Sequence, residues 1–208
     1  LFINTCIMKI ILLTTLLFLF AFNGIIAQTS GTLSITFTTS SAGGNYSPKN
    51  IVAVWVEDKS GDFVKTLMAY ANTRKTHLNN WQASTTAAGS AYNTTDAITG
   101  STRSSHSART CFWDGRDMNG NIVDDGVYTI RFELTDKNAT GNYFSFNISK
   151  GNASMNYSPS NSPSFTSISL NWVPGPTSVT EEENLVPFKI FPNPTNGDLK
   201  IINSNDDL

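Results

Sequence analysis

A strict alternation of apolar and polar side chains constrains the fold of this chain more than any other feature. Between residues 128 and 135, four apolar residues alternate with four polar ones: Tyr128, Ile130, Phe132 and Leu134 against Thr129, Arg131, Glu133 and Thr135. A period of two places successive side chains on opposite faces of a β-strand, so we expect one buried face and one solvated face. The same period recurs at Leu33–Phe37, Phe144–Ile148 and Ile168–Trp172.

Three further segments complete a set of strands. Ile51–Val56 is a continuous apolar run, typical of a central strand. Phe63–Leu67 follows a polar turn and is expected to return as a hairpin, and Ala108–Trp113 is another strand. About seven strands with Gly, Asn and Asp turns predict an all-β, immunoglobulin-like antiparallel β-sandwich. Arg74–Trp81 is expected to form one helical turn that packs Leu78 and Trp81 over an end of the sandwich.

The two ends of the chain differ in composition from the predicted sandwich. Met8-Lys9 is the expected start, and the apolar run from Ile10 to Phe22 followed by small residues predicts a signal peptide within residues 1–27. A membrane anchor is the alternative, but the run is short for a bilayer. We therefore expect the general secretion machinery as a partner and cleavage before Gln28. The sandwich is assigned to residues 28–172, a Pro- and Glu-rich linker to 173–184, and a C-terminal segment to 185–208.

Charge and cysteine content exclude several classes of protein. Only 14% of the 208 residues are charged and the formal net charge is -2, so nothing points to nucleic acid or an anionic membrane. The predicted mature chain keeps one of the two cysteines, Cys111, so it has no intramolecular disulfide. Cys111 lies in a strand-like run, where a buried, inert thiol is expected rather than a nucleophile.

The C-terminal segment carries a recognisable string of residues. An alternating strand is followed by a turn with Asn-Gly, a strong turn signal, in the order Phe191-Pro192-Asn193-Pro194-Thr195-Asn196-Gly197. This string resembles the opening of the type A C-terminal sorting domain of the type IX secretion system of Bacteroidetes. The resemblance implies delivery to the outer surface or medium by that system. The chain stops at Leu208, so we expect only the start of such a domain, in truncated form.

A second recognisable segment follows the strand at Ala108–Trp113. Its characteristic residues are Trp113, Asp114, Gly115, Asp117, Gly120, Gly126 and Tyr128. It resembles the Trp-Asp-Gly hairpin of immunoglobulin-like domains related to the flagellar hook-cap protein. We expect two aromatic core anchors, aspartates that bond turn N–H groups, and glycines that relax the backbone. Calcium binding is the alternative, although an EF-hand is excluded because its first and twelfth positions would be glycines.

Taken together, the chain resembles an exported bacterial family catalogued as domain of unknown function 2271. The matching pieces are Val54–Leu67, Leu78–Trp81, Asp96–Arg103 and the Trp113 segment. The resemblance implies a compact β-sandwich in the periplasm or at the cell surface, with no known activity.

One segment suggests a covalent cofactor. Its residues are Asp96, Thr99, Gly100, Ser101, Thr102 and Arg103. They are similar to the target motif of periplasmic flavin transferases, in which the final Thr receives FMN through a phosphoester bond. The resemblance implies a flavin transferase as partner, and Arg103 could pair with the attached phosphate. Ser101 stands where the motif prefers Ala, and the alternative is a surface loop in which Asp96 caps a turn.

Evidence for catalysis is weaker. The only histidines, His77 and His106, are far apart in the sequence, and the chain lacks a Gly-x-Ser-x-Gly elbow and a phosphate loop. A triad or a metal site built on either histidine has no supporting spacing. The sequence therefore predicts a secreted, non-catalytic binding or structural module without a cofactor, and alternatively a carrier of covalent FMN at Thr102 in extracytosolic electron transfer.

Overall fold

The computed structural model describes residues 27–176, 188–191 and 200–203. The chain divides into two compact units, the first ending at Gly175 and the second beginning at Pro176. The second unit contains a short antiparallel pair, β10 (Phe188–Phe191) and β11 (Lys200–Asn203). The predicted signal peptide and the sorting residues from Pro192 to Gly197 lie outside the described residues. Within the described ranges, no helix has the length and apolar character needed to span a membrane.

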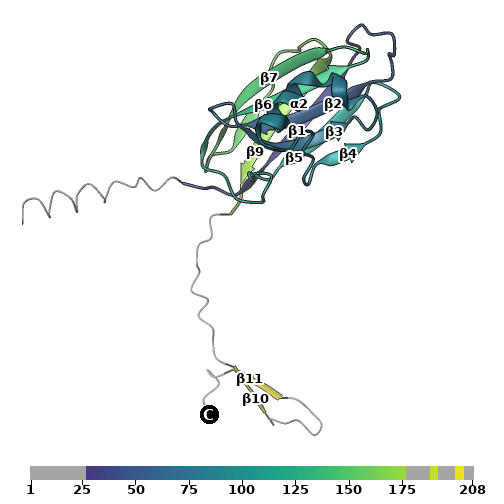
Figure 1. Ribbon diagram of the computed structural model, residues 1–208. Coiled ribbons are helices and arrows are strands. Elements are labelled where there is room, and N and C mark those ends of the chain that lie inside the picture. The colour runs from purple at the N-terminus through teal and green to yellow at the C-terminus, as the bar shows by residue number, and fades with distance from the viewer. Residues whose placement is uncertain (1–26, 177–187, 192–199, 204–208) are drawn as a thin grey trace, which may run out of the picture. The chain divides into compact units, whose positions relative to one another are not determined.

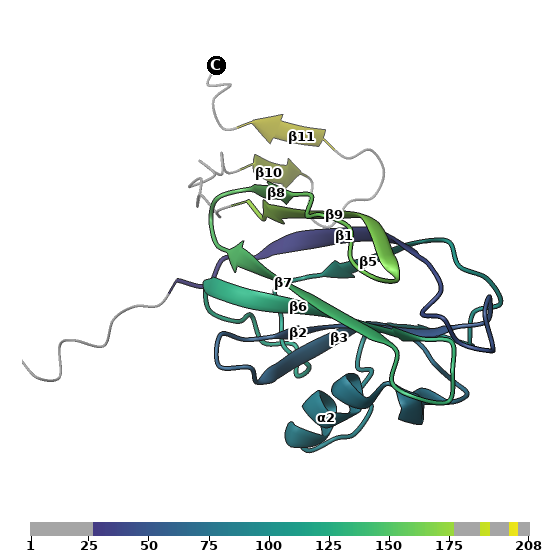
Figure 2. The same ribbon diagram turned by 90° about the horizontal axis from the view of Figure 1, so that it is seen from above.

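The first unit is a sandwich of two sheets (Figures 1 and 2). The four-stranded sheet has the order β5-β1-β9-β8 and the five-stranded sheet has the order β4-β3-β2-β6-β7. The strands are β1 (Gly31–Thr39), β2 (Ile51–Glu57), β3 (Phe63–Tyr70), β4 (Ile98–Gly100), β5 (Ala108–Trp113), β6 (Gly126–Thr135), β7 (Asn142–Lys150), β8 (Met155–Tyr157) and β9 (Phe165–Pro174). The predicted β-sandwich is confirmed.

The details differ from the prediction in three respects. The edge strands β4 and β8 have three residues each, too few to show a period of two, so the sequence did not indicate them. The pair β3–β4 is parallel, so the sandwich is not wholly antiparallel. Strand β9 ends at Pro174, so Val173 and Pro174 belong to the sandwich and not to the linker.

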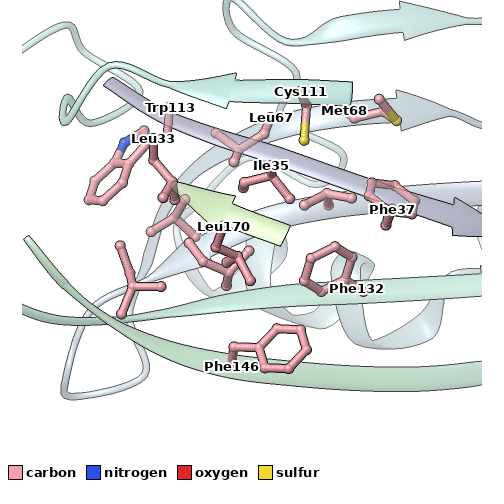
Figure 3. Close-up of a cluster of buried hydrophobic side chains, with 14 of the residues drawn as sticks. Leu33, Ile35, Phe37, Leu67, Met68, Cys111, Trp113, Phe132, Phe146 and Leu170 are labelled. Atoms are coloured by element: carbon pink, nitrogen blue, oxygen red, sulfur yellow. The ribbon is translucent and has the colours of Figure 1, made fainter. Parts of the chain in front are cut away.

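The core lies between the two sheets and is built from the apolar positions of the alternating segments. Leu33, Ile35 and Phe37 of β1 point toward Phe132 of β6 and Phe146 of β7 (Figure 3). The rings of Phe37 and Phe132 meet edge to face with centroids 5.3 Å apart. Full burial of such side chains stabilises the fold by about 1.5–3 kcal/mol each. The expected inward positions are therefore confirmed.

A helix covers the outer face of the five-stranded sheet (Figure 2). A 3₁₀ turn, η1 (Lys75–His77), leads into α2 (Asn79–Ala87). Leu78 and Trp81 pack with Trp55 in a second buried cluster. The predicted single turn at an end of the sandwich is therefore wrong in length and place. Its length was missed because the Ser84-Thr85-Thr86 stretch of α2 favours helix only weakly.

Tertiary contacts stabilise this helix. Glu133, expected on the solvated face of β6, is fully buried beneath α2. Its carboxylate accepts hydrogen bonds from the backbone N–H groups of Trp81 at 2.9 Å and Asn80 at 3.2 Å. These donors have no partner within the helix, so Glu133 serves as a cap from another element. Burial raises the pKa of Glu133, and the hydrogen bonds from Trp81 and Asn80 offset part of that effect.

Candidate functional site

The segment with the flavin-motif resemblance runs along the edge of the five-stranded sheet. Ile98–Gly100 forms β4, whose residues pair in parallel with Met68–Tyr70 of β3. A Cβ atom at Gly100 would lie 2.8 Å from the ring of Tyr70, so this position requires glycine. This part of the motif is therefore a strand and not a loop, since β4 pairs with the neighbouring strand β3.

Both ends of the motif are also held. Asp96 adopts a positive φ of 55°, and its carboxylate lies 3.6 Å from the ammonium of Lys65. Arg103 exchanges two backbone hydrogen bonds with Asn50, each of 2.9 Å. The guanidinium of Arg103 lies 4.6 Å above the ring of Tyr70, in cation–π geometry. Arg103 is therefore stacked rather than simply solvated.

The hydroxyl groups of the motif differ in exposure. Thr99 and Ser101 are exposed, and Thr102 is partly buried. The hydroxyl of Thr102 donates to the carbonyl of Thr73 at 3.3 Å. A carbonyl can accept a hydrogen bond from this hydroxyl but cannot serve as the base that a threonine nucleophile needs.

Lys65 connects the two motifs identified in the sequence. Its ammonium lies 3.6 Å from Asp96 and 3.5 Å from Asp114, while its side chain is only 7% exposed. Lys65 was not among the site residues predicted from the sequence. A charged residue inside the mainly apolar strand β3 was the available signal, because buried lysines need a charged partner.

The segment from Trp113 to Tyr128 connects the two sheets. Strand β5 pairs with β1, whereas β6 pairs with β2 and β7 in the other sheet. The predicted hairpin between these strands is therefore wrong. Only a small antiparallel bridge, Arg116 with Ile122, closes the turn between them.

Trp113 and Tyr128 are confirmed as core anchors. Their ring centroids lie 4.9 Å apart. The indole N–H of Trp113 donates to the carbonyl of Arg116 at 2.8 Å, and the hydroxyl of Tyr128 donates to the carbonyl of Asp124 at 2.6 Å. Burial, followed by the nearby charge of Asp124, raises the pKa of Tyr128 to about 12. The two polar tips thus fix both ends of the connection.

The aspartates of this segment bond the turns as predicted. Asp114 accepts from the N–H of Arg116 at 3.1 Å, and Asp117 accepts from Asn119 at 2.8 Å and Asn121 at 2.9 Å. Burial alone would raise the pKa of Asp117, but the hydrogen bonds from Asn121 and Asn119 lower it overall. Gly115 and Gly120 have φ values of 71° and 85°, which favour glycine. Within the described part of the chain, no three His, Cys, Asp or Glu side chains converge as a metal site would require.

A family model described as "Predicted periplasmic protein (DUF2271)" matches residues 32–161. The chain belongs to this family. The match runs from β1 through β8 and contains both the Asp96–Arg103 segment and the Trp113–Tyr128 connection. The predicted family resemblance is thereby confirmed, and with it a predicted periplasmic setting. No curated protein and no solved structure matches the chain.

The histidines of the DUF2271 domain do not form a triad. His106 lies 3.9 Å from the carboxylate of Asp136, and burial lowers its pKa against the opposing effect of Asp136. Ser41 donates directly to the same carboxylate at 2.6 Å. A Ser-His-Asp triad needs the histidine between the other two groups, so this arrangement is not one. His77 lies in η1, and Cys111 is fully buried with a raised thiol pKa.

Within the described residues of the first unit, no helix or strand covers the outer face of the four-stranded sheet of the DUF2271 domain, and its outward side chains are uncharged. We call it the hydroxyl face. Across the strands, Ser34 of β1 stands between Phe112 of β5 and Asn171 of β9, and Asn171 stands opposite Asn156 of β8. Phe112 is 54% exposed. Alternation along the strands defines the whole face as Thr32, Ser34, Thr36, Thr38, Thr110, Phe112, Asn156, Ser169, Asn171 and Val173.

Proposed function

We propose that this DUF2271 protein acts outside the cytoplasm as a non-catalytic binding module. The observation that supports this proposal is the hydroxyl face, whose outward side chains are hydroxyls, amides, one phenyl ring and one valine. The most buried charged side chains bond other parts of the fold and are not free for catalysis. Glu133 caps α2, Asp136 bonds the loop at Ser41, and Lys150 pairs with Asp125.

The chemistry of the hydroxyl face suits a neutral, hydroxyl-rich polymer such as a polysaccharide. Hydroxyl and amide groups can both donate and accept hydrogen bonds, as sugar hydroxyls do. Phe112 adds a flat apolar surface on which a sugar ring can rest. The face offers no charged group that would pair with an acidic or a basic polymer.

Retention of the protein on insoluble polysaccharides tests this proposal. We expect retention on neutral polymers, such as cellulose or amylose, and not on acidic ones. Phe112→Ala should weaken binding at least about tenfold, or 1.4 kcal/mol. Tyr143→Ala, which removes a 40% exposed aromatic ring from the other sheet, is the matched control. Equal binding by both variants, or none by the unmodified protein, would overturn the glycan assignment.

We further propose export by the type IX secretion system, because the string from Phe191 to Gly197 resembles its sorting signal. The periplasmic description of the family supports passage across the inner membrane. The test is to express the full chain in a Bacteroidetes host with and without that system. We expect the protein outside the cell in the intact host and in the periplasm of the defective host. The same location in both hosts would contradict the proposal.

A second candidate function is the carriage of covalent FMN. The observation that favours it is the position of Thr102 at the surface, directly after the exposed Ser101 and the sterically required Gly100. A transferase using FAD would join the Thr102 oxygen to the phosphorus of the FMN half, break the pyrophosphate bond, release AMP and accept the hydroxyl proton. The product would carry a flavin suited to electron transfer.

Intact mass after co-expression with a flavin transferase tests this candidate. We expect a mass gain equal to one FMN less one water, absent in Thr102→Ala. Ser101→Ala is the matched control, because the motif prefers Ala there, and it should be modified at least as well as the parent protein. If a reference substrate of the transferase is modified and this protein gains no mass, the carrier function is ruled out.

A further inference from the structure

A small pocket lies between α2, β3 and β4, on the same side of the domain as the flavin motif. Its volume is about 120 Å³, and its walls include Ala69, Ala71, Lys75, Trp81, Tyr92 and Thr99. Ala69 of β3 and Ala71 just after this strand leave the space open, because a larger side chain at either position would enter it. The pocket is slightly smaller than the cavity of about 150 Å³ that binds benzene, so it holds at most one six-membered ring, and the rest of a larger ligand must lie outside it.

The aromatic wall of the pocket is held in an unusual conformation. The rings of Trp81 and Tyr92 lie 5.4 Å apart at 60°. Tyr92 has a positive φ of 59°, a strained value for a non-glycine residue, and its backbone N–H donates to the hydroxyl of Thr85 at 2.9 Å. Its own hydroxyl is buried and has no hydrogen-bond partner within the described residues. A buried polar group without a partner is costly, and a ligand could supply the missing hydrogen bond.

Two links connect Thr102 with the pocket. Thr99 belongs to both the pocket wall and the motif. The hydroxyl of Thr102 donates to the carbonyl of Thr73, which directly follows the pocket residue Asn72 in the chain. A group tethered at Thr102 through a short flexible chain would therefore start near the pocket.

We propose that the pocket is the docking site for the isoalloxazine ring of FMN carried on Thr102. This inference rests on the carrier function proposed above. The pocket accepts the pyrimidine ring of the isoalloxazine against Trp81 and Tyr92, where a carbonyl oxygen of that ring can accept a hydrogen bond from the Tyr92 hydroxyl. The ribityl chain bridges to the phosphoester. The ammonium of Lys75, 4.8 Å from the centroid of the Tyr92 ring, then lies near the flavin and favours its anionic reduced form.

Fluorescence of the flavinylated protein tests the docking. An aromatic ring in contact quenches flavin emission, so the attached flavin should be several-fold dimmer than free FMN and protected from iodide. Tyr92→Leu should restore emission and iodide access several-fold. Tyr157→Leu, which removes a 45% exposed ring on β8 of the other sheet, should change neither. Lys75→Gln, at an exposed position, should lower the flavin reduction potential, whereas Lys59→Gln should not.

The outcomes separate the docking from the carrier function. Flavinylated protein with the emission and iodide access of free FMN would overturn the docking and leave the carrier standing. An unchanged potential in Lys75→Gln would remove the role of Lys75. Protein that cannot be flavinylated would overturn both.

Discussion

The carboxylate of Glu133, on the central part of the five-stranded sheet, accepts a hydrogen bond from the backbone N–H of Trp81 at 2.9 Å. Trp81 in turn donates its indole N–H to the hydroxyl of Thr66 at 2.9 Å. One buried carboxylate thereby positions the start of α2, and α2 supplies Trp81 to the wall of the pocket. The geometry of the candidate site depends on this contact.

Removal of the Glu133 carboxylate should destabilise the fold. Glu133→Ala leaves the N–H groups of Asn80 and Trp81 without their partner, and we expect a loss of about 2–3 kcal/mol in the free energy of unfolding. Glu133→Gln keeps one carbonyl acceptor and should lose less. Urea unfolding measures both values. A loss under about 0.5 kcal/mol for the alanine variant, within the range of surface substitutions, would contradict the capping role.

Asp136 should make stability depend on pH. Burial would raise the pKa of Asp136, but hydrogen bonds from Ser41, Ala42 and Gly44 lower it overall. Its contribution is therefore fully present above the unfolded value, about 3.9, and is lost as pH falls through the folded value. Asp136→Asn should lower the free energy of unfolding by about 1–3 kcal/mol at pH 7. This difference from the parent protein should shrink below about pH 4.

The control for this experiment is Asp62→Asn, at an exposed turn position. It should leave the pH profile unchanged. His106 adds a second dependence, because burial lowers its pKa and stability should also decline as pH falls below about 6.5. Measurements in a His106→Asn background remove that contribution. A constant difference between parent and Asp136→Asn from pH 7 to 2.5 would disprove the assignment.

Two adjacent glycines should respond differently to substitution. A Cβ at Gly44 would overlap the carbonyl group of Asp136, so Gly44→Ala should cost about 3 kcal/mol, at the upper end of overpacking. Gly43 has a φ of 77° and open space around it, so Gly43→Ala should cost only the backbone strain, about 1 kcal/mol. Thermal unfolding of the two variants measures the contrast, and equal losses would show that the overlap is relieved.

Cys111 should be unreactive in the folded protein. It is fully buried between the sheets, and burial raises the pKa of its thiol, so little thiolate forms at neutral pH. In the mature chain, we expect Ellman's reagent to label it only at the rate of unfolding. Ser104→Cys places a thiol at an exposed site and should react within the mixing time. Rapid labelling of Cys111 under native conditions would refute its core position.

The sequence predicted the long strands of the sandwich better than the elements they contact. Alternation placed Tyr128 and Phe132 in the core correctly, because a period of two reports directly which face of a strand is buried. It failed at Glu133, since a polar residue on the alternating face is expected to be solvated unless another element covers it. Likewise, the motif at Asp96–Arg103 was visible, whereas Lys65 and Tyr92 were not, because nothing local marks a residue that acts through a distant contact.

The sequence by itself determined the β class, the anchors Trp113 and Tyr128 and the burial of Cys111, because each follows from local pattern, and motif resemblance indicated the family. Only the tertiary structure decided which sheet each strand joins, that α2 covers the outer face, and that Trp81 and Tyr92 line a pocket whose wall also contains Thr99 of the motif. Such features depend on contacts between residues far apart in the chain. A strand or helix pattern indicates which side chains of a segment can be buried. The element against which they pack depends on the rest of the fold.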